Sequence, residues 1–238
     1  MQTNTLNRKK SKRKIKNIKA QSKMDIKYID AKTDNQSRIM ESFEDNELTV
    51  VHGYPGTGKT FIALYMALTE LDISDYDKIY IVRSSVSTRE IGFQPGKTDE
   101  KMQVHEGPYP AIVAELYGRG DAYSILKQKD LIEFMSTSFA RGTTFNNAIV
   151  IIDEFQNMDF NELSTMITRF GKNCKMILTG DTGQDDLTSE RYNEESGARK
   201  IMDILETMDD STVGFVEMGI EDIVRSGFVK EFIIAKYA

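Results

Sequence analysis

The segment GYPGTGKT, residues 53–60, has four residues whose types and spacing suit phosphate binding: Gly53, Gly58, Lys59 and Thr60. They fill the P-loop pattern of glycine, four residues, glycine, lysine and a hydroxyl residue. Backbone N–H groups of such a loop surround phosphates at a helix start, the lysine reaches the β- and γ-phosphates, and the hydroxyl binds magnesium. A glycine-rich turn without a ligand is the alternative. We expect nucleotide contacts from Gly53, Tyr54, Pro55, Gly56, Thr57, Gly58, Lys59, Thr60 and Phe61.

A second stretch, AIVIIDEFQN at residues 148–157, ends an apolar run on two adjacent carboxylates, Asp153 and Glu154. In P-loop proteins a carboxylate at the end of a buried strand helps to hold the metal ion. We therefore assign Asp153 to Mg²⁺ together with Thr60, directly or through water. Glu154 is expected to be the general base that polarises the attacking water, and this step distinguishes a hydrolase from a protein that only binds nucleotide. Alone the pattern is weak, because helix caps also use such acids.

Two glutamines extend the predicted site. Gln184 in GDTGQ follows another apolar run and could sense the γ-phosphate, although a polar turn is the alternative. The stretch differs from a GTPase switch because its glutamine falls one residue too early, and the chain has no NKxD stretch, so ATP is favoured over GTP. Gln36 precedes Gly53 at the distance of a helicase Q motif, whose glutamine contacts the adenine edge.

Short apolar runs rich in β-branched residues alternate with helical patterns along the chain. The runs predicted as buried strands are 48–52, 78–82, 131–136, 148–152 and 174–179. Core-facing stripes at helical spacing are Phe61, Leu64, Leu68 and Leu71; Phe160, Leu163, Ile167 and Phe170, behind an Asp159 cap; and Ile201, Ile204, Leu205 and Met208. The alternation predicts a three-layer α/β fold around a mostly parallel sheet, with ligands at the carboxyl ends of the strands.

The charge distribution divides the chain into two parts. Nine of its 31 Lys and Arg residues lie between Arg8 and Lys23, and no acid precedes Asp25. Residues 1–24 are therefore predicted to be a disordered basic tail that either contacts nucleic-acid phosphates or only aids solubility. Residues 25–238 form the predicted domain. No apolar run is long enough to span a membrane, and the single cysteine, Cys174, suits a small core residue in a reducing cytoplasm.

Taken together, these stretches resemble the phosphate-starvation-inducible PhoH-like ATPases. The resemblance covers about residues 34–236, and it is carried by the P-loop and by REIGFQPGKTDEK, FARGTTFNNAIVIIDE, LTGDTGQDDL, ESGARK and EDIVRSGFVKEFI. It implies a P-loop fold related to the superfamily 1 helicase core, ATP hydrolysis, assembly into a homo-oligomeric ring such as a hexamer, and action on RNA. This chain has Arg83-Ser84 where the family usually has Arg-Pro, and it shows no PIN nuclease domain, so we do not expect it to cut RNA itself.

Several arginine and lysine side chains remain to be assigned a role. A finger arginine would stabilise charge on the γ-phosphate. By resemblance to a helicase motif, Arg225 is the first choice and Arg141 the second, with Arg169 also in a matching segment; a surface salt bridge is the alternative for each. Arg83, Lys97 and Lys101 are candidates for a nucleic-acid path or for a solvated loop.

Three classes of function remain open from the sequence. The first is an ATP-hydrolysing, helicase-like protein that remodels RNA or single-stranded nucleic acid. The second is a nucleotide-dependent assembly or switch protein with slow hydrolysis and no nucleic-acid substrate. The third is a small-molecule kinase, for which the sequence offers no arginine-bearing lid. One RecA-like lobe is expected from a chain of this size, so a neighbouring subunit would complete the site.

Overall fold

A computed structural model describes residues 24–74, 76–84, 106–181 and 197–237 of the chain. Its centre is a six-stranded sheet of order β3-β2-β4-β5-β1-β6, in which every neighbouring pair is parallel. The strands are β1 (Leu48–Gly53), β2 (Lys78–Arg83), β3 (Ile132–Ser136), β4 (Ala148–Asp153), β5 (Cys174–Thr179) and β6 (Val213–Met218). The predicted three-layer α/β fold is confirmed, and the sheet is wholly parallel.

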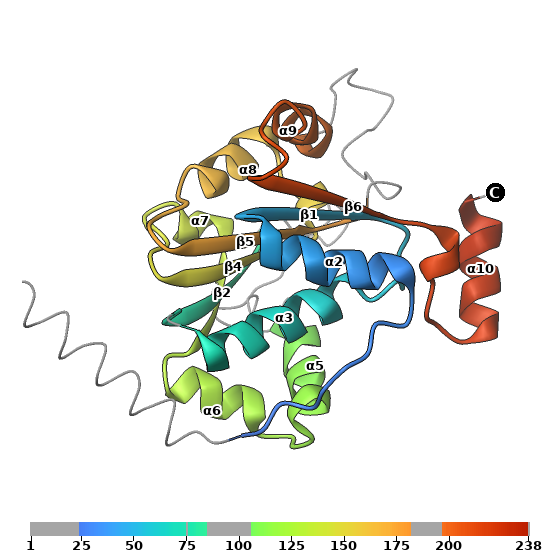
Figure 1. The fold of residues 1–238 in the computed structure, drawn as a ribbon, viewed down its shortest axis with the longest axis horizontal. Helices are drawn as coiled ribbons and strands as arrows, with labels where there is room; N and C mark the ends of the chain where they lie inside the picture. The colour runs from blue at the N-terminus through green and yellow to red at the C-terminus, as the bar shows by residue number, and fades with distance from the viewer. Residues whose placement is uncertain (1–23, 75, 85–105, 182–196, 238) are drawn as a thin grey trace, which may run out of the picture.

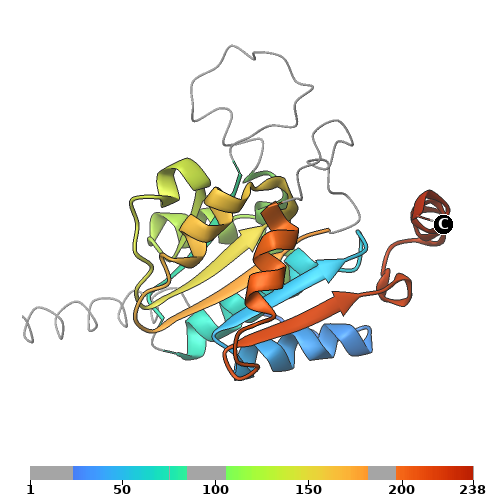
Figure 2. The ribbon, with the colours of Figure 1, turned by 90° about the horizontal axis from the view of Figure 1, so that it is seen from above.

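Helices cover both faces of this sheet (Figures 1 and 2). One face carries α2 (Asp34–Asp45), α3 (Lys59–Ile73), α5 (Pro108–Tyr117) and α6 (Ala122–Gln128). The other carries α7 (Thr137–Ala140), α8 (Phe160–Ile167) and α9 (Gly197–Leu205). Two 3₁₀ turns, η1 (Phe155–Asn157) and η2 (Ile220–Asp222), follow β4 and β6. Each face of the sheet therefore has its own apolar core.

The predicted strands form at the expected places because their side chains are buried on both faces. Every residue of β4 is buried, as a parallel strand between two helical layers requires. The sixth strand, β6, has no counterpart among the predicted strands. Its sequence, VGFVEM, contains a glycine and a glutamate, and only some of its residues are buried. An edge strand needs less apolar character than a central one, which is why the apolar runs did not reveal it.

The helical stripes are mostly confirmed as core. Asp159 begins α8 with a capping box, in which its side chain accepts from the N–H of Glu162 and the Glu162 side chain accepts from the N–H of Asp159. The third stripe is partly wrong. Ile201 and Leu205 are buried, but Ile204 is 49% exposed and Met208 is 43% exposed, since α9 ends at Leu205 and only one side of it packs on the sheet.

The last helix, α10 (Gly227–Tyr237), stands apart from both layers, beyond the end of β6 (Figure 1). Ile233 is its buried residue, whereas Phe228 is 80% exposed and Phe232 is 62% exposed. Its last residue, Tyr237, packs edge to face on Tyr54 of the P-loop. The described part of the chain thus ends beside the predicted nucleotide site. Among the described residues, no helix has the length and apolar character that crossing a membrane requires.

Candidate functional site

The P-loop connects the end of β1 to the start of α3, as the sequence predicted. A Cβ at Gly53 would lie 2.2 Å from the carbonyl oxygen of Met218 in β6, so only glycine fits there. The Tyr54 N–H donates to that same oxygen at 3.0 Å. Gly58 precedes α3 with a φ of 88°, which favours glycine. The loop therefore packs against β6, with its N–H groups at a helix N-terminus.

Lys59 lies folded over this loop. Its ammonium donates to the carbonyl oxygens of Gly53 at 2.9 Å and Tyr54 at 2.6 Å. Burial lowers the pKa of Lys59, while the nearby carboxylates of Asp181, Glu154 and Asp153 raise it. These opposing effects leave a partly desolvated cation facing three acids, and such a cation is suited to a phosphate.

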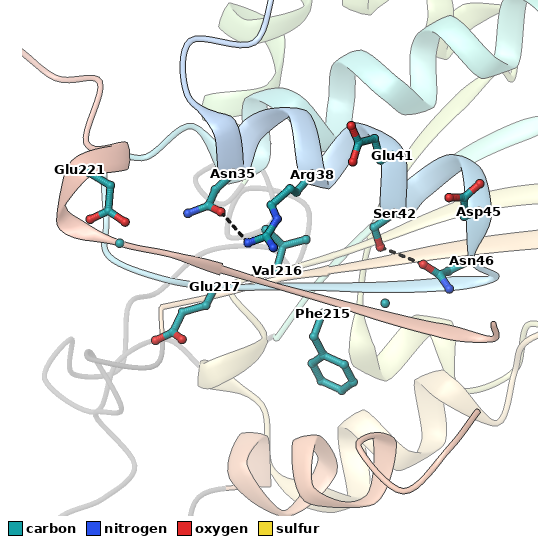
Figure 3. Close-up of a pocket in the computed structure, with 12 residues that line it drawn as sticks. Asn35, Arg38, Glu41, Ser42, Asp45, Asn46, Phe215, Val216, Glu217 and Glu221 are labelled. Carbon is teal, nitrogen blue, oxygen red and sulfur yellow. Dashed lines mark hydrogen bonds between the residues drawn. The ribbon is translucent and has the colours of Figure 1, made fainter. Parts of the chain in front are cut away.

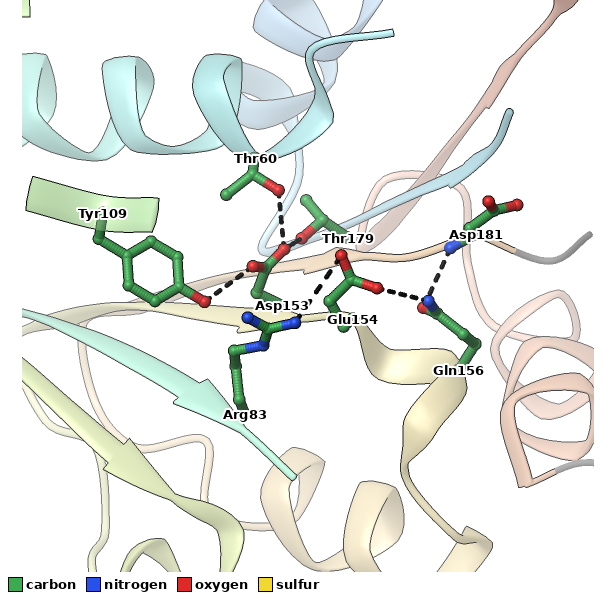
Figure 4. Close-up of polar contacts among 8 residues, drawn as sticks. All are labelled: Thr60, Arg83, Tyr109, Asp153, Glu154, Gln156, Thr179 and Asp181. Atoms are coloured by element: carbon green, nitrogen blue, oxygen red, sulfur yellow. Dashed lines mark hydrogen bonds and ion pairs between the residues drawn. The ribbon is translucent and has the colours of Figure 1, made fainter. Parts of the chain in front are cut away.

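Asp153 is the centre of a small hydrogen-bond cluster at the end of β4 (Figure 4). Its Oδ1 accepts from the hydroxyls of Thr60 at 2.8 Å and Thr179 at 2.6 Å. Its Oδ2 accepts from the hydroxyl of Tyr109 on α5 at 2.8 Å. Burial raises the pKa of Tyr109 well above its usual value, and the Asp153 carboxylate adds to the increase, so the phenol stays a donor. The carboxylate is thereby fixed beside the P-loop hydroxyl.

Glu154 follows Asp153 in a left-handed backbone conformation, with a φ of 56°. Its Oε2 accepts from the amide nitrogen of Gln156 at 2.6 Å, and its Oε1 lies 3.9 Å from a guanidinium nitrogen of Arg83 (Figure 4). Burial raises the pKa of Glu154, and the adjacent Asp153 raises it further, while Arg83 and Gln156 lower it. Because a base works best with a pKa near the working pH, these surroundings suit proton abstraction.

Gln36 connects the helical layer to the P-loop. Its amide nitrogen donates to the Thr57 carbonyl oxygen at 2.9 Å, and its amide oxygen accepts from the Lys32 N–H at 2.8 Å. The side chain is buried, near the start of α2. The Thr57 hydroxyl in turn donates to the Tyr54 carbonyl at 3.0 Å. Gln36 thus lies against the loop where the sequence placed it.

These groups surround one cavity of about 440 Å³. Its walls include Gln36, the loop from Pro55 to Phe61, both carboxylates of the DE pair, and Asp181 after β5. Gly53 and Tyr54, also predicted to contact nucleotide, are not among the cavity-lining residues, and their carbonyl oxygens accept from the Lys59 ammonium. The chain therefore brings Lys59, Thr60, Asp153 and Glu154 together as expected.

The arginines separate into different places. Arg225, after η2, is exposed and lies on the cavity wall, with its Cγ 2.8 Å from where a Cβ of Gly56 would be. Arg141 is exposed after α7 and is not among the cavity-lining residues. The carbonyl oxygen of Arg169 accepts from the N–H of Phe145, just before β4 begins. Arg169 therefore lies at the amino-terminal end of the strands, opposite the end that carries Asp153. Within one chain, only Arg225 of these three adjoins the cavity.

Some predicted residues lie outside the described part of the chain: Gln184, Lys97, Lys101 and the basic tail up to Lys23. Other site residues were missed by sequence reasoning. Thr179 would follow from the strand order, because it pairs in register with Asp153. Tyr109 carries no motif that points to Asp153. The sequence suggested Arg83 only for nucleic acid, yet it lies beside Glu154.

A second cavity, of about 690 Å³, lies between α2 and the outer strand β6 (Figure 3). Its walls carry Arg38 and several acids, among them Glu41, Glu217 and Glu221. It is larger than the P-loop cavity, but it contains none of the P-loop or DE residues. Size alone therefore does not identify the functional site here.

The chain matches a known protein family over most of its length. Residues 28–237 match the family model described as PhoH-like protein. The PhoH-like protein of Mycobacterium leprae (strain TN) is 34% identical over 192 residues, covering 79% of this chain and 53% of that protein. Protein PhoH of Escherichia coli (strain K12) is 33% identical over 186 residues, covering 77% and 51%. The chain thus spans about half the length of the curated relatives it matches.

Among solved structures, the large terminase from a thermophilic bacteriophage aligns with a TM-score of 0.50 at 11% identity. The alignment covers 87% of this chain and 50% of that chain. At this identity the likeness shows the fold alone, a P-loop NTPase-like α/β domain.

Proposed function

Because the chain belongs to the PhoH-like protein family, we propose that it binds ATP with Mg²⁺ in the P-loop cavity and hydrolyses it. We further propose that hydrolysis drives remodelling of RNA or single-stranded nucleic acid. One observation carries the ATPase proposal. The Thr60 hydroxyl lies 2.8 Å from Asp153, and Glu154 lines the same cavity, so a metal position and a base adjoin one phosphate loop.

The donor set fits magnesium. Mg²⁺ prefers oxygen ligands and is bound by one or two protein groups together with phosphates and water. Thr60 and Asp153 offer a hydroxyl and a carboxylate oxygen at the polar wall of the cavity. When bound, the ion would neutralise charge on the β- and γ-phosphates. Thr179 and Tyr109 keep the carboxylate turned toward Thr60.

The remaining residues of the cavity bind the nucleotide and orient the attacking water. The loop N–H groups and Lys59 hold the phosphates, and Gln36 lies where an adenine could be contacted. Glu154 accepts a proton from the attacking water. Arg225, on the wall of the same chain's cavity, is our first choice for the cation that stabilises the γ-phosphate oxygens, with Arg141 of a neighbouring subunit as the second.

The nucleic-acid step rests on charge and family. Nine basic residues between Arg8 and Lys23 form a run that would neutralise phosphates. A cytoplasmic location is part of the same proposal.

A nucleotide-dependent assembly is the second candidate, and α10 favours it. Phe228 and Phe232 are exposed on a helix whose Ile233 and Tyr237 contact the P-loop. A second copy that covered these rings would meet the nucleotide site, as a ring of subunits requires. We therefore propose a homo-oligomeric ring, such as a hexamer, for both candidates.

Phosphate release measured with and without single-stranded RNA tests the proposal. We expect ATP turnover that requires Mg²⁺ and is stimulated by RNA. Glu154→Gln should keep ATP binding and lose at least about 100-fold in turnover, as expected for loss of a general base. Lys59→Ala should lose nucleotide affinity. Normal hydrolysis by Glu154→Gln would reject Glu154 as the base.

Two further readouts separate the alternatives. Slow turnover that RNA leaves unchanged, with a mass that rises on adding ATP and Mg²⁺, would favour the assembly protein. A monomer under all conditions would exclude an arginine supplied by a neighbouring subunit.

A further inference from the structure

Gln156 joins the ends of two neighbouring strands. It lies in η1, is 2% exposed, and uses both ends of its amide (Figure 4). The nitrogen donates to Glu154 Oε2 at 2.6 Å, and the oxygen accepts from the Asp181 N–H at 3.0 Å. Glu154 follows β4, whereas Asp181 follows β5. One side chain therefore connects the predicted base to the backbone just after the next strand.

The orientation of this amide follows from its partners. A carboxylate can only accept and a backbone N–H can only donate, so the NH₂ group must face Glu154. A hydrogen bond to a charged group is stronger than one between neutral groups, so this contact holds the carboxylate firmly. The position is also closely packed, since a Cβ at Gly180 would lie 2.7 Å from Gln156 Oε1. A glycine at residue 180 thus leaves room for the bridge.

The Gln156 amide makes the shorter of the two polar contacts to the Glu154 carboxylate. Its second oxygen, Oε1, is 3.9 Å from Arg83, beyond hydrogen-bond distance. Its backbone adopts a left-handed conformation, which is unfavourable for a residue other than glycine. Of these two contacts, only the one with the Gln156 amide is short enough to fix the direction of the Glu154 carboxylate as a hydrogen bond.

We propose that Gln156 is a positioning residue that orients Glu154 for water activation and couples this orientation to the backbone at Asp181. The proposal rests on the proposed ATPase function. Asp181 lines the phosphate cavity, so a shift of its backbone when phosphate binds or leaves would move the amide and, with it, the base. Gln156 touches Glu154 and Asp181 but is not among the residues that line the cavity, and hence it acts through the base.

The test compares Gln156→Met, which keeps the length and removes both hydrogen bonds, with Gln156→Glu, which keeps an acceptor for Asp181 and places a second carboxylate against Glu154. For both we expect kcat to fall about 10- to 100-fold while KM for ATP stays within about threefold, since misplaced catalytic groups cost rate rather than binding. Asn157→Ala, in the same turn, is the matched control and should keep wild-type kcat. The urea unfolding midpoint of each variant, compared with that of the wild-type protein, shows whether it folds. If Gln156→Met does not fold, the kcat of Gln156→Glu tests the proposal.

A double-mutant cycle separates positioning from a general structural effect. In single-turnover measurements at high protein concentration, adding Gln156→Met to Glu154→Gln should lower the residual rate less than about twofold. An equal loss in both backgrounds, an unchanged kcat in Gln156→Met, or a rise in KM alone would each overturn the proposal.

The two proposals fail in different ways. If wild-type protein hydrolyses ATP, Glu154→Gln is inactive and Gln156→Met is normal, only the role of Gln156 is rejected. If wild-type protein and Glu154→Gln release phosphate at the same rate, the ATPase site itself is wrong.

Discussion

The hydroxyl of Thr60 lies 2.8 Å from the carboxylate of Asp153, although 93 positions separate them in the chain. Thr60 is in the first turn of α3, and Asp153 is the last residue of β4. Their meeting places a phosphate loop and an acidic strand end at one edge of the sheet, where parallel α/β folds bind ligands.

Thr60→Val keeps the β-branched shape and removes the oxygen. We expect ATP turnover to fall about 10- to 100-fold and the Mg²⁺ concentration for half-maximal turnover to rise, because the ion loses a ligand. Thr69→Val is the control, because Thr69 lies on the same helix and its buried hydroxyl has no hydrogen-bond partner among the described residues. A magnesium titration of ATP turnover in both variants tests this prediction. An unchanged titration for Thr60→Val would contradict the assignment of Thr60 as a ligand of Mg²⁺.

Tyr109→Phe should weaken metal binding without changing the loop. The phenol is one of three hydroxyl donors to Asp153, and a hydrogen bond to a charged group is worth about 1.5–3 kcal/mol. We expect the half-maximal Mg²⁺ concentration to rise about 10- to 100-fold while affinity for metal-free ATP stays the same. Tyr117→Phe, at the other end of α5, serves as the control. Equal magnesium requirements in the two variants would show that Tyr109 only packs.

Gln36→Ala should lower ATP affinity about tenfold and GTP affinity less. Both nucleotides lose the support that Gln36 gives to Thr57 in the loop. Only ATP would lose a contact to the adenine edge, for which the amide still has one hydrogen and one lone pair. Fluorescent-nucleotide binding with competition by ATP and GTP measures both effects. An equal loss for the two nucleotides would limit Gln36 to supporting the loop.

Much of the site was predictable because its parts are local patterns. The P-loop and the AIVIIDE stretch each fix chemistry and secondary structure together, and a parallel sheet brings their ends to one edge. The partners of Asp153 and Glu154 were not predictable in the same way. Tyr109 reaches Asp153 from a helix on another layer, so the contact depends on packing that no spacing encodes.

The edge strand and the third helical stripe show a second limit. β6 pairs with β1 through its backbone, and backbone pairing leaves little trace in side-chain type. Ile204 has the spacing of a core residue but is exposed. Helical spacing of apolar residues shows which of them share one face of a helix, but it does not show how much of that face is buried.

We expect the buried thiol of Cys174 to make the free energy of unfolding depend on pH. Burial raises the pKa of its thiol to about 11. The folded state therefore holds the proton more tightly than the unfolded state, whose thiol ionises near about pH 8.5. The contribution of this thiol to the free energy of unfolding is fully present below that pH. It is lost as the pH rises toward 11, by up to about 3 kcal/mol.

Urea unfolding at about pH 8 and about pH 10, in parallel with Cys174→Ala, measures this component. The wild-type midpoint should fall more between the two pH values than that of the variant. In native protein at the lower pH the thiol should also react with a disulfide reagent much more slowly than in urea. Rapid reaction of the folded protein would contradict its burial.

The approach of Gly53 to Met218 has a consequence for biosynthesis. The phosphate loop is translated well before the strand that braces it, because Met218 of β6 lies far downstream of Gly53, and the Val224 N–H that donates to the Gly56 carbonyl follows later still. A nascent chain that ends before β6 would carry every residue of the loop without the wall that shapes it. We therefore expect ribosome-bound chains of increasing length to gain affinity for ATP only once translation has passed these residues.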